Sequence, residues 1–221
     1  MDYGFTMAAY AVATVLFVLA LGGLSNQEKA KRAVWYGIVG MAVAVLATMV
    51  GPGSGLWVLS LVLIALGGLV GWQLAARVKM TQMPQLVALF NGVGGGAAGL
   101  VALLELEHST TVGAFIAVAF TVLVGGIAFS GSVVTFLKLQ ELMPTRPIIF
   151  AGHAIVIIAL LIAGLAAATI IVLDDAVLSS LGLADARGPA AFVGLVIGLA
   201  LGVLLVLPVG GHSLAGLPSR A

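Results

Sequence analysis

Seven long apolar runs constrain the fold of this chain more than any other feature of its sequence. They are charge-free and cover about residues 5–24, 34–50, 55–76, 83–104, 112–136, 148–173 and 189–209. A helix that crosses a bilayer needs about 20 apolar residues, and lipid offers no partner for exposed backbone amides. The sequence therefore predicts an all-α, multi-pass membrane protein with seven transmembrane helices. The second run is short, so we expect it to extend into the neighbouring link or to lie in a thinned bilayer.

The composition also predicts that lipid, and not water, surrounds most of the surface of this protein. Only 8% of the residues are charged and 62% are hydrophobic, whereas soluble domains carry about 25% charged residues. Cysteine is absent, which excludes disulfides and thiolate metal sites, and we predict no metal site. The net charge of +1 gives no basic surface for nucleic acid. Because the N-terminus lacks a basic cluster, the first run is expected to be a mature span and not a cleaved signal peptide.

The links between the runs predict the orientation. Eight of the nine Lys and Arg residues fall in alternate links and in the C-terminal tail, and cytoplasmic loops are enriched in these residues. We therefore expect the N-terminus outside and the C-terminus in the cytoplasm. The eight residues are Lys29, Lys31, Arg32, Arg77, Lys79, Lys138, Arg146 and Arg220.

Many of the 30 glycines form ridges at helical spacing. Small residues four apart let transmembrane helices approach closely, so we interpret these ridges as helix-packing surfaces. They comprise Gly67 and Gly71, then Gly92, Gly95, Gly96 and Gly99, and then Gly194, Gly198 and Gly202. The stretch 94–99 also matches the dinucleotide fingerprint, but it lies inside a span with no strand before it, and a nucleotide site is rejected there.

Uncharged polar residues carry the candidate chemistry inside the spans, where we expect no ionisable group. Asn91 is the only Asn within a span and lies about 12 Å from the start of its helix at 1.5 Å per residue. Its amide needs a partner and can order water, but it does not exchange a proton near neutral pH. Ser130, Ser132 and Thr135 gather at one end of the fifth span, where hydroxyls often bond only to their own helix. His153, near the start of the sixth span, is interpreted as a packed or interfacial residue.

Three stretches, in the right order, resemble the beta subunit of the proton-translocating NAD(P) transhydrogenase. They are GLSNQEKAKRAVWYGIVGMAVAVLATMVGPG (residues 23–53), MTQMPQLVALFNGVGGGAAGLVALLE (80–105) and FSGSVVTFLKLQELM (129–143). The resemblance covers residues 1–211, and its MPxLVA segment is specific. It implies a transmembrane domain in a cell (inner) membrane that couples proton passage to reversible hydride transfer between NAD(H) and NADP(H).

The same resemblance implies where the rest of the machinery lies. The nucleotides bind in cytoplasmic domains outside this stretch, so we expect no catalytic residue and no bound cofactor here. The implied partners are the alpha subunit with its membrane helices, the NADP(H)-binding domain and a second beta chain in a homodimer. Residues 212–221 do not match the family, which continues into further spans, and we interpret them as a truncation or as a tail added for expression.

One departure from the family concerns the proton path. Many members carry a membrane histidine shortly after MPxLVA, where this chain has Asn91. We therefore expect the titrating group to come from a helix of the alpha subunit that faces Asn91. Ser132, in the GSV segment, is the second candidate on the path, and Thr81, Gln82 and Pro84 form a turn suited to contacting the NADP(H) domain.

Two other functional classes remain open from the residues alone. A secondary transporter of a small neutral solute would use a broken helix at mid-membrane, and the glycine-rich fourth span is the only candidate. A non-catalytic membrane assembly subunit is also compatible with the lack of buried charge.

Overall fold

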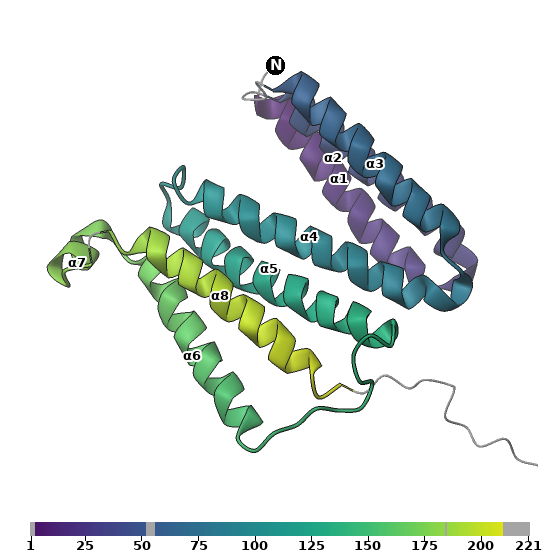
Figure 1. Cartoon of the computed structure of the whole chain (residues 1–221). Coiled ribbons are helices and arrows are strands. Elements are labelled where there is room, and N and C mark those ends of the chain that lie inside the picture. Colours follow the sequence, from purple (N-terminus) through teal and green to yellow (C-terminus); the bar gives the residue numbers. More distant parts are fainter. Residues whose placement is uncertain (1–2, 52–55, 184, 210–221) are drawn as a thin grey trace, which may run out of the picture. The chain divides into compact units, whose positions relative to one another are not determined.

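The chain is built from long helices. The computed structural model describes residues 3–51, 56–183 and 185–209, and these contain helices and no strand. Seven helices are long and apolar enough to cross a membrane, which confirms the predicted all-α, seven-span fold (Figure 1). They are α1 (Tyr3–Leu24), α2 (Gln27–Val50), α3 (Trp57–Arg77), α4 (Met83–Glu105), α5 (Val112–Leu139), α6 (His153–Val172) and α8 (Arg187–Val206). A 3-10 turn, η1 (Met80–Gln82), precedes α4, and the short α7 (Asp175–Ser180) precedes α8. The predicted tail, residues 212–221, lies outside the described residues.

The helix boundaries differ from the expected ones in ways that local chemistry explains. The short second span extends back to Gln27, because the side chain of Asn26 accepts a hydrogen bond from the Glu28 amide at 3.0 Å and caps the helix. The sixth span, with an apolar run that starts at 148, begins only at His153. Gly152, with φ at 86°, precedes this helix, and glycine adopts such a conformation without steric cost.

The long helices carry ionisable residues near their ends, where the expected spans stopped short of them, and two of these residues, Lys138 and His153, are buried. Helix α5 continues past the predicted end at 136 to Leu139, so Lys138 belongs to its last turn and is buried. The expected end reflects the charge of Lys138, but its neighbours Leu137 and Leu139 are apolar and the helix continues through them.

The chain forms two compact units, residues 1–76 and 77–221. In the first unit, α1 and α2 pack along their length through small residues, and the Tyr10 hydroxyl lies 2.9 Å from Thr48 Oγ1. Helix α3 buries none of its residues. A Cβ added to Gly67 or Gly71 would meet no atom within 4 Å, so this predicted ridge faces open space in the described chain.

The second unit is organised around α5, which contacts α4, α6 and α8 (Figure 1). Glycines of α5 bring the backbones together. A Cβ on Gly125 would lie 2.7 Å from the carbonyl oxygen of Gly95 in α4, and one on Gly126 would lie 3.0 Å from that of Leu195 in α8. Helices at such a distance leave no room for side chains or water between them.

The buried residues of this unit change from apolar to polar along α5. Near the start of α5 the buried clusters are apolar and contain Phe115, Val118, Ala119 and Val122, together with residues of α4, α6 and α8. The buried polar side chains of the described residues are Ser130, Ser132, Lys138 and His153. The last third of α5 and the start of α6 therefore hold the polar part of the core.

Candidate functional site

The structure brings together the two residues that the sequence places on a proton path. The side-chain amide Nδ2 of Asn91, on α4, donates a hydrogen bond of 2.9 Å to Oγ of Ser132, on α5. Ser132 is buried, whereas Asn91 is exposed on the surface of this chain. The two side chains thus form a polar contact that reaches from the α4–α5 interface to the outside of the bundle.

Ser132 differs from the two hydroxyl residues beside it. Ser130 donates to the carbonyl of Gly126 and Thr135 to that of Gly131, each one turn back in the same helix. Such bonds satisfy the hydroxyl locally and imply no further role. Ser132 instead receives the bond from Asn91, and among the described residues no acceptor takes its own proton. Its hydroxyl is free to donate to water or to another group.

The Asn91 side chain also has hydrogen-bonding groups without a partner among the described residues. Its amide carries one acceptor oxygen and two N–H donors, and the bond to Ser132 uses one donor. No group among residues 3–51, 56–183 and 185–209 donates to its Oδ1. An exposed amide in a membrane requires a partner from a neighbouring helix or from water, so Oδ1 of Asn91 needs a hydrogen-bond donor beyond the contacts of the described residues.

The glycines that follow Asn91 fit α4 against α5. A Cβ on Gly92 would lie 3.0 Å from Cβ of Ser132, one on Gly95 would lie 2.7 Å from Cβ of Ala128, and one on Gly96 would lie 2.9 Å from the Phe129 ring. Gly99 approaches Gly125 with its backbone, since a Cβ on Gly125 would lie 2.9 Å from the Gly99 nitrogen. The literal dinucleotide fingerprint is thus an uninterrupted part of α4 that packs on α5.

The three glycines of the predicted ridge on α8 differ in how closely they approach α5. A Cβ on Gly198 would lie 2.5 Å from the carbonyl oxygen of Leu123, and one on Gly202 would overlap with Ser130 Oγ and the carbonyl oxygen of Ile127. A Cβ on Gly194 would only reach Val122 at 3.9 Å. Close backbone contact therefore involves Gly198 and Gly202 of α8, which lie against residues 123–131 of α5.

A second set of polar contacts ties three helix ends together, and we call this region the Lys138 end of the unit. Nε2 of Gln85, in the first turn of α4, donates to the carbonyl of Leu139 at 2.7 Å, and Gln140 donates to Oε1 of Gln85 at 2.9 Å. Lys138 donates to carbonyls at the end of α8. No sequence pattern predicts these contacts, because a lysine beside a span is normally interpreted as a loop residue.

The predicted coupling turn also lies at this end. Thr81 and Gln82 belong to η1, and Pro84 occupies the first turn of α4, where its missing N–H costs no hydrogen bond. Oε1 of Gln82 accepts from the Lys79 amide at 3.3 Å. Thr81 and Pro84 are exposed, so the turn presents a short polar surface. His153 is buried beside Phe150, with their ring centroids 4.8 Å apart, in line with the packed role expected of it.

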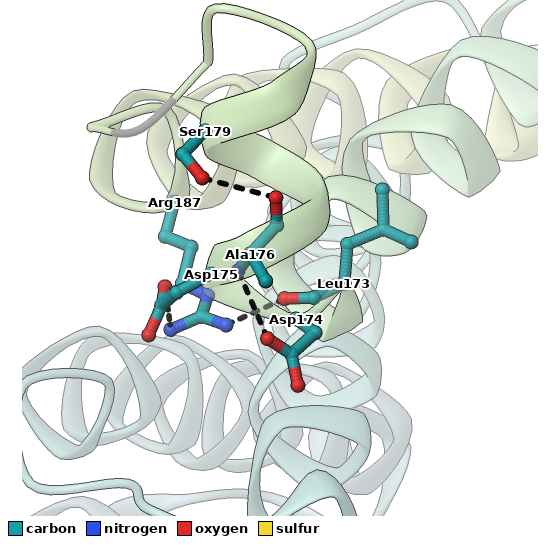
Figure 2. Close-up of polar contacts among 6 residues, drawn as sticks. All are labelled: Leu173, Asp174, Asp175, Ala176, Ser179 and Arg187. Atoms are coloured by element: carbon teal, nitrogen blue, oxygen red, sulfur yellow. Dashed lines mark hydrogen bonds and ion pairs between the residues drawn. The ribbon is translucent and has the colours of Figure 1, made fainter.

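At the opposite end of the unit, Arg187 of α8 contacts the starts or ends of α5, α6 and α7, and Figure 2 shows its contacts with Leu173 and Asp175. Its guanidinium lies 4.3 Å from the ring centroid of Phe115, at the start of α5. It also donates to the carbonyl of Leu173, at the end of α6, and pairs with Asp175 of α7 at 2.8 Å. The neighbouring Asp174 accepts from the Ala176 amide at 2.9 Å and caps α7. We interpret this cluster as structural, because the guanidinium ties the Leu173 carbonyl, the Asp175 carboxylate and the Phe115 ring together, while its Nε is buried without a partner among the described residues.

We expect Arg187→Met to lower the free energy of unfolding by more than Asp175→Asn does. The Asp175 side chain is 78% exposed, and an exposed ion pair contributes about 0–1 kcal/mol. Loss of the guanidinium also removes the contact with Phe115, about 0.5–2 kcal/mol for a cation over a ring, and leaves the Leu173 carbonyl without its side-chain donor. Thermal unfolding of the two variants in detergent measures the difference. Equal losses would show that the exposed ion pair accounts for the whole effect.

Comparison with known proteins identifies a matching family and similar sequences. A family model of the NAD(P) transhydrogenase beta subunit matches residues 6–215. The NAD(P) transhydrogenase subunit beta of Rhodospirillum rubrum is 43% identical over 160 residues, which cover 68% of this chain and 34% of that relative. A second sequence from a named strain of the same organism shows the same identity and coverage. The chain thus spans about a third of the length of the curated relatives it matches.

Proposed function

This chain belongs to the NAD(P) transhydrogenase beta-subunit family, and from that premise we propose that it forms part of a proton path across the membrane. In this proposal, proton passage drives reversible hydride transfer between NAD(H) and NADP(H). The nucleotides bind in cytoplasmic domains outside residues 1–221, so the reacting atoms do not lie in this bundle. The chain is a multi-pass membrane subunit of this enzyme family, and its contribution is to conduct protons and to couple their movement to the nucleotide domains.

The hydrogen bond between Asn91 and Ser132 is the observation that carries the proposal. Its direction leaves Asn91 Oδ1 as a free acceptor on the outside and the Ser132 hydroxyl as a free donor on the inside. Water molecules ordered by an acceptor at one end and a donor at the other can pass a proton along their hydrogen bonds. Neither side chain titrates near neutral pH, so a separate ionisable group has to take up and release the proton.

That group comes, in this proposal, from a membrane helix of the alpha subunit that faces Asn91. The exposed amide supports this, since it needs a partner that the described residues do not provide. A structure of the assembled complex with no acidic or histidine side chain within hydrogen-bonding reach of Asn91, directly or through one water, would contradict it.

The apolar interior of the second unit supports a path along the outside of the bundle. Between the level of Ser130 and that of Phe115, the buried side chains of the described residues are apolar, and glycines of α5 touch the backbones of α4 and α8. A water chain requires a polar and sufficiently roomy site. Protons therefore reach Asn91 along the exposed face of α4, at the interface with the partner helix, and not through the centre of the bundle.

The turn with Thr81, Gln82 and Pro84 completes the proposal as the contact with the NADP(H)-binding domain. It lies at the same end of α4 as Gln85, two turns before Asn91. A displacement of that domain would thus act directly on the helix that carries the proton-path amide. We further propose that the complex contains two copies of this chain.

The proposal is tested with the full-length beta chain and its alpha partners in sealed vesicles. Reduction of an NADP analogue by NADH is followed together with a pH-sensitive dye, and we expect hydride transfer to build a pH gradient that an uncoupler abolishes. Hydride transfer without a gradient would contradict the proton path. Absence of both activities, with uptake of a neutral solute instead, would favour a secondary transporter, and absence of all three would favour an assembly subunit.

A further inference from the structure

Lys138 is a charged side chain buried at the end of a transmembrane helix. It is 4% exposed, and its ammonium donates three hydrogen bonds, to the carbonyl oxygens of Val206 at 2.9 Å, Leu207 at 2.6 Å and Val209 at 2.8 Å. A lysine ammonium has three N–H donors, so all of them are used. The three acceptors belong to one short stretch, where α8 ends.

These bonds satisfy both partners. The last carbonyls of a helix lack donors within the helix and carry partial negative charge, whereas a buried ammonium requires pairing with acceptors. Lys138 on α5 thus caps α8 from outside. A bond of 3.0 Å from the Ile148 amide to the Leu207 carbonyl adds a further contact to the same helix end.

The cap lies close to the polar pair of the proton path. Lys138 and Ser132 are six residues apart on α5, about 9 Å along the helix axis. The end of α5 is also tied to the start of α4 through Gln85, six residues before Asn91. Consequently α5 contacts the Asn91 side chain through Ser132 and, about 9 Å further along the same helix, holds the end of α8 through Lys138. A shift of α5 at Ser132 must move the stretch after Val206, because three charge-assisted bonds connect them.

We propose that Lys138 is a positioning residue that couples the Asn91–Ser132 pair to the chain that follows α8. This inference rests on the proposed function and extends it by naming the link that transmits a displacement from the proton path. Lys138 itself neither takes up nor releases the transported proton. Its role is to keep α5 and the end of α8 moving as one body.

Lys138→Met tests the proposal, since the thioether keeps the chain length and removes the donors. In vesicles with the full-length complex, we expect the number of protons moved per hydride transferred to fall about fivefold or more, the lower range of coupling between linked sites. Lys138→Arg, which retains charge and several donors, is expected to keep the ratio within about twofold of wild type, which corresponds to a loss of at most about 0.4 kcal/mol of coupling free energy. Lys31→Met, on the exposed side of α2, is the matched control and should leave the ratio unchanged.

The ratio separates positioning from mere stability, because a loss of folded complex lowers proton and hydride rates in parallel. A wild-type complex that pumps, together with an unchanged ratio in Lys138→Met, would overturn the role of Lys138 alone. A wild-type complex that transfers hydride without a gradient would overturn the proposed function and this inference with it.

A distance measurement gives a readout that does not depend on activity. The chain has no cysteine, so spin labels attached to Glu141→Cys and Val209→Cys report only on the ends of α5 and α8. We expect a narrow distance distribution with Lys138 and with Lys138→Arg, and a broad one with Lys138→Met. A distribution that stays narrow in Lys138→Met would contradict the link.

Discussion

Asn91→Leu is expected to lower both proton pumping and coupled hydride transfer about 100-fold, the lower range for loss of a group that assists proton transfer. Leucine has a similar volume but no acceptor for a proton-carrying neighbour and no donor for Ser132. The bond of 2.9 Å would be lost, and the exposed position on α4 would become apolar. Paired rates of analogue reduction and dye response in reconstituted vesicles measure the effect, normalised to the amount of assembled complex.

Two variants determine whether the chemistry or the packing of this position matters. Asn91→His introduces the residue that the family resemblance places there, so we expect it to retain pumping, with a pH profile that follows the new imidazole. Ser132→Ala removes the inner hydroxyl and should lower pumping less than Asn91→Leu does, because water can replace a buried hydroxyl more easily than a helix-to-helix amide. Full activity of Asn91→Leu would exclude the side chain from the proton path.

Gly198→Ala is expected to destabilise the second unit strongly. The added methyl group would lie 2.5 Å from the carbonyl oxygen of Leu123 and 3.3 Å from Cα of Gly126. Both are backbone atoms of α5, so no side-chain rotation relieves the overlap and the two helices must separate. Overpacking of this kind costs about 1–3 kcal/mol or more. Thermal unfolding of the purified protein in detergent should show a clear fall in Tm.

Gly194→Ala is the matched control on the same helix. The sequence pattern treats the two glycines alike, but the added methyl group at 194 would meet only Val122, at 3.9 Å. Alanine is favoured over glycine in a helix by about 0.5–1 kcal/mol, so this variant should be neutral or slightly more stable. Similar destabilisation by both substitutions would mean that α8 does not pack on α5 as described.

The spans were predictable from the sequence because membrane insertion depends on local composition. Apolar length alone predicts seven helices, and the polar exception within α4 draws attention to Asn91. Its bond to Ser132 was not predictable, since the two residues lie 41 positions apart in the chain and their contact depends on how α4 and α5 are rotated against each other. The glycine pattern predicted close packing but not which members make contact: Gly198 touches backbone atoms, whereas Gly67 faces open space.

The polar end contacts could not be predicted, for a physical reason. A lysine at the edge of an apolar run has the same local signature whether it extends into water or folds back onto another helix. Only the position of α8, whose end lies 68 residues after Lys138 in the chain, decides between the two. The same holds for Arg187, which the sequence places in a link together with Asp174, Asp175 and Asp185 and the structure places over the Phe115 ring.

The Lys138 cap on α8 can form only late in the synthesis of the chain. Ribosomal synthesis delivers α5 to the membrane well before α8, so the ammonium of Lys138 initially has no carbonyls to bind and stays at the bilayer surface, as long cationic side chains do. It enters the interior only when α8 arrives with its free carbonyl groups. Burial of this one charge therefore reports completion of the second unit, and a nascent chain stopped before Val206 would keep Lys138 accessible to water-soluble amine reagents.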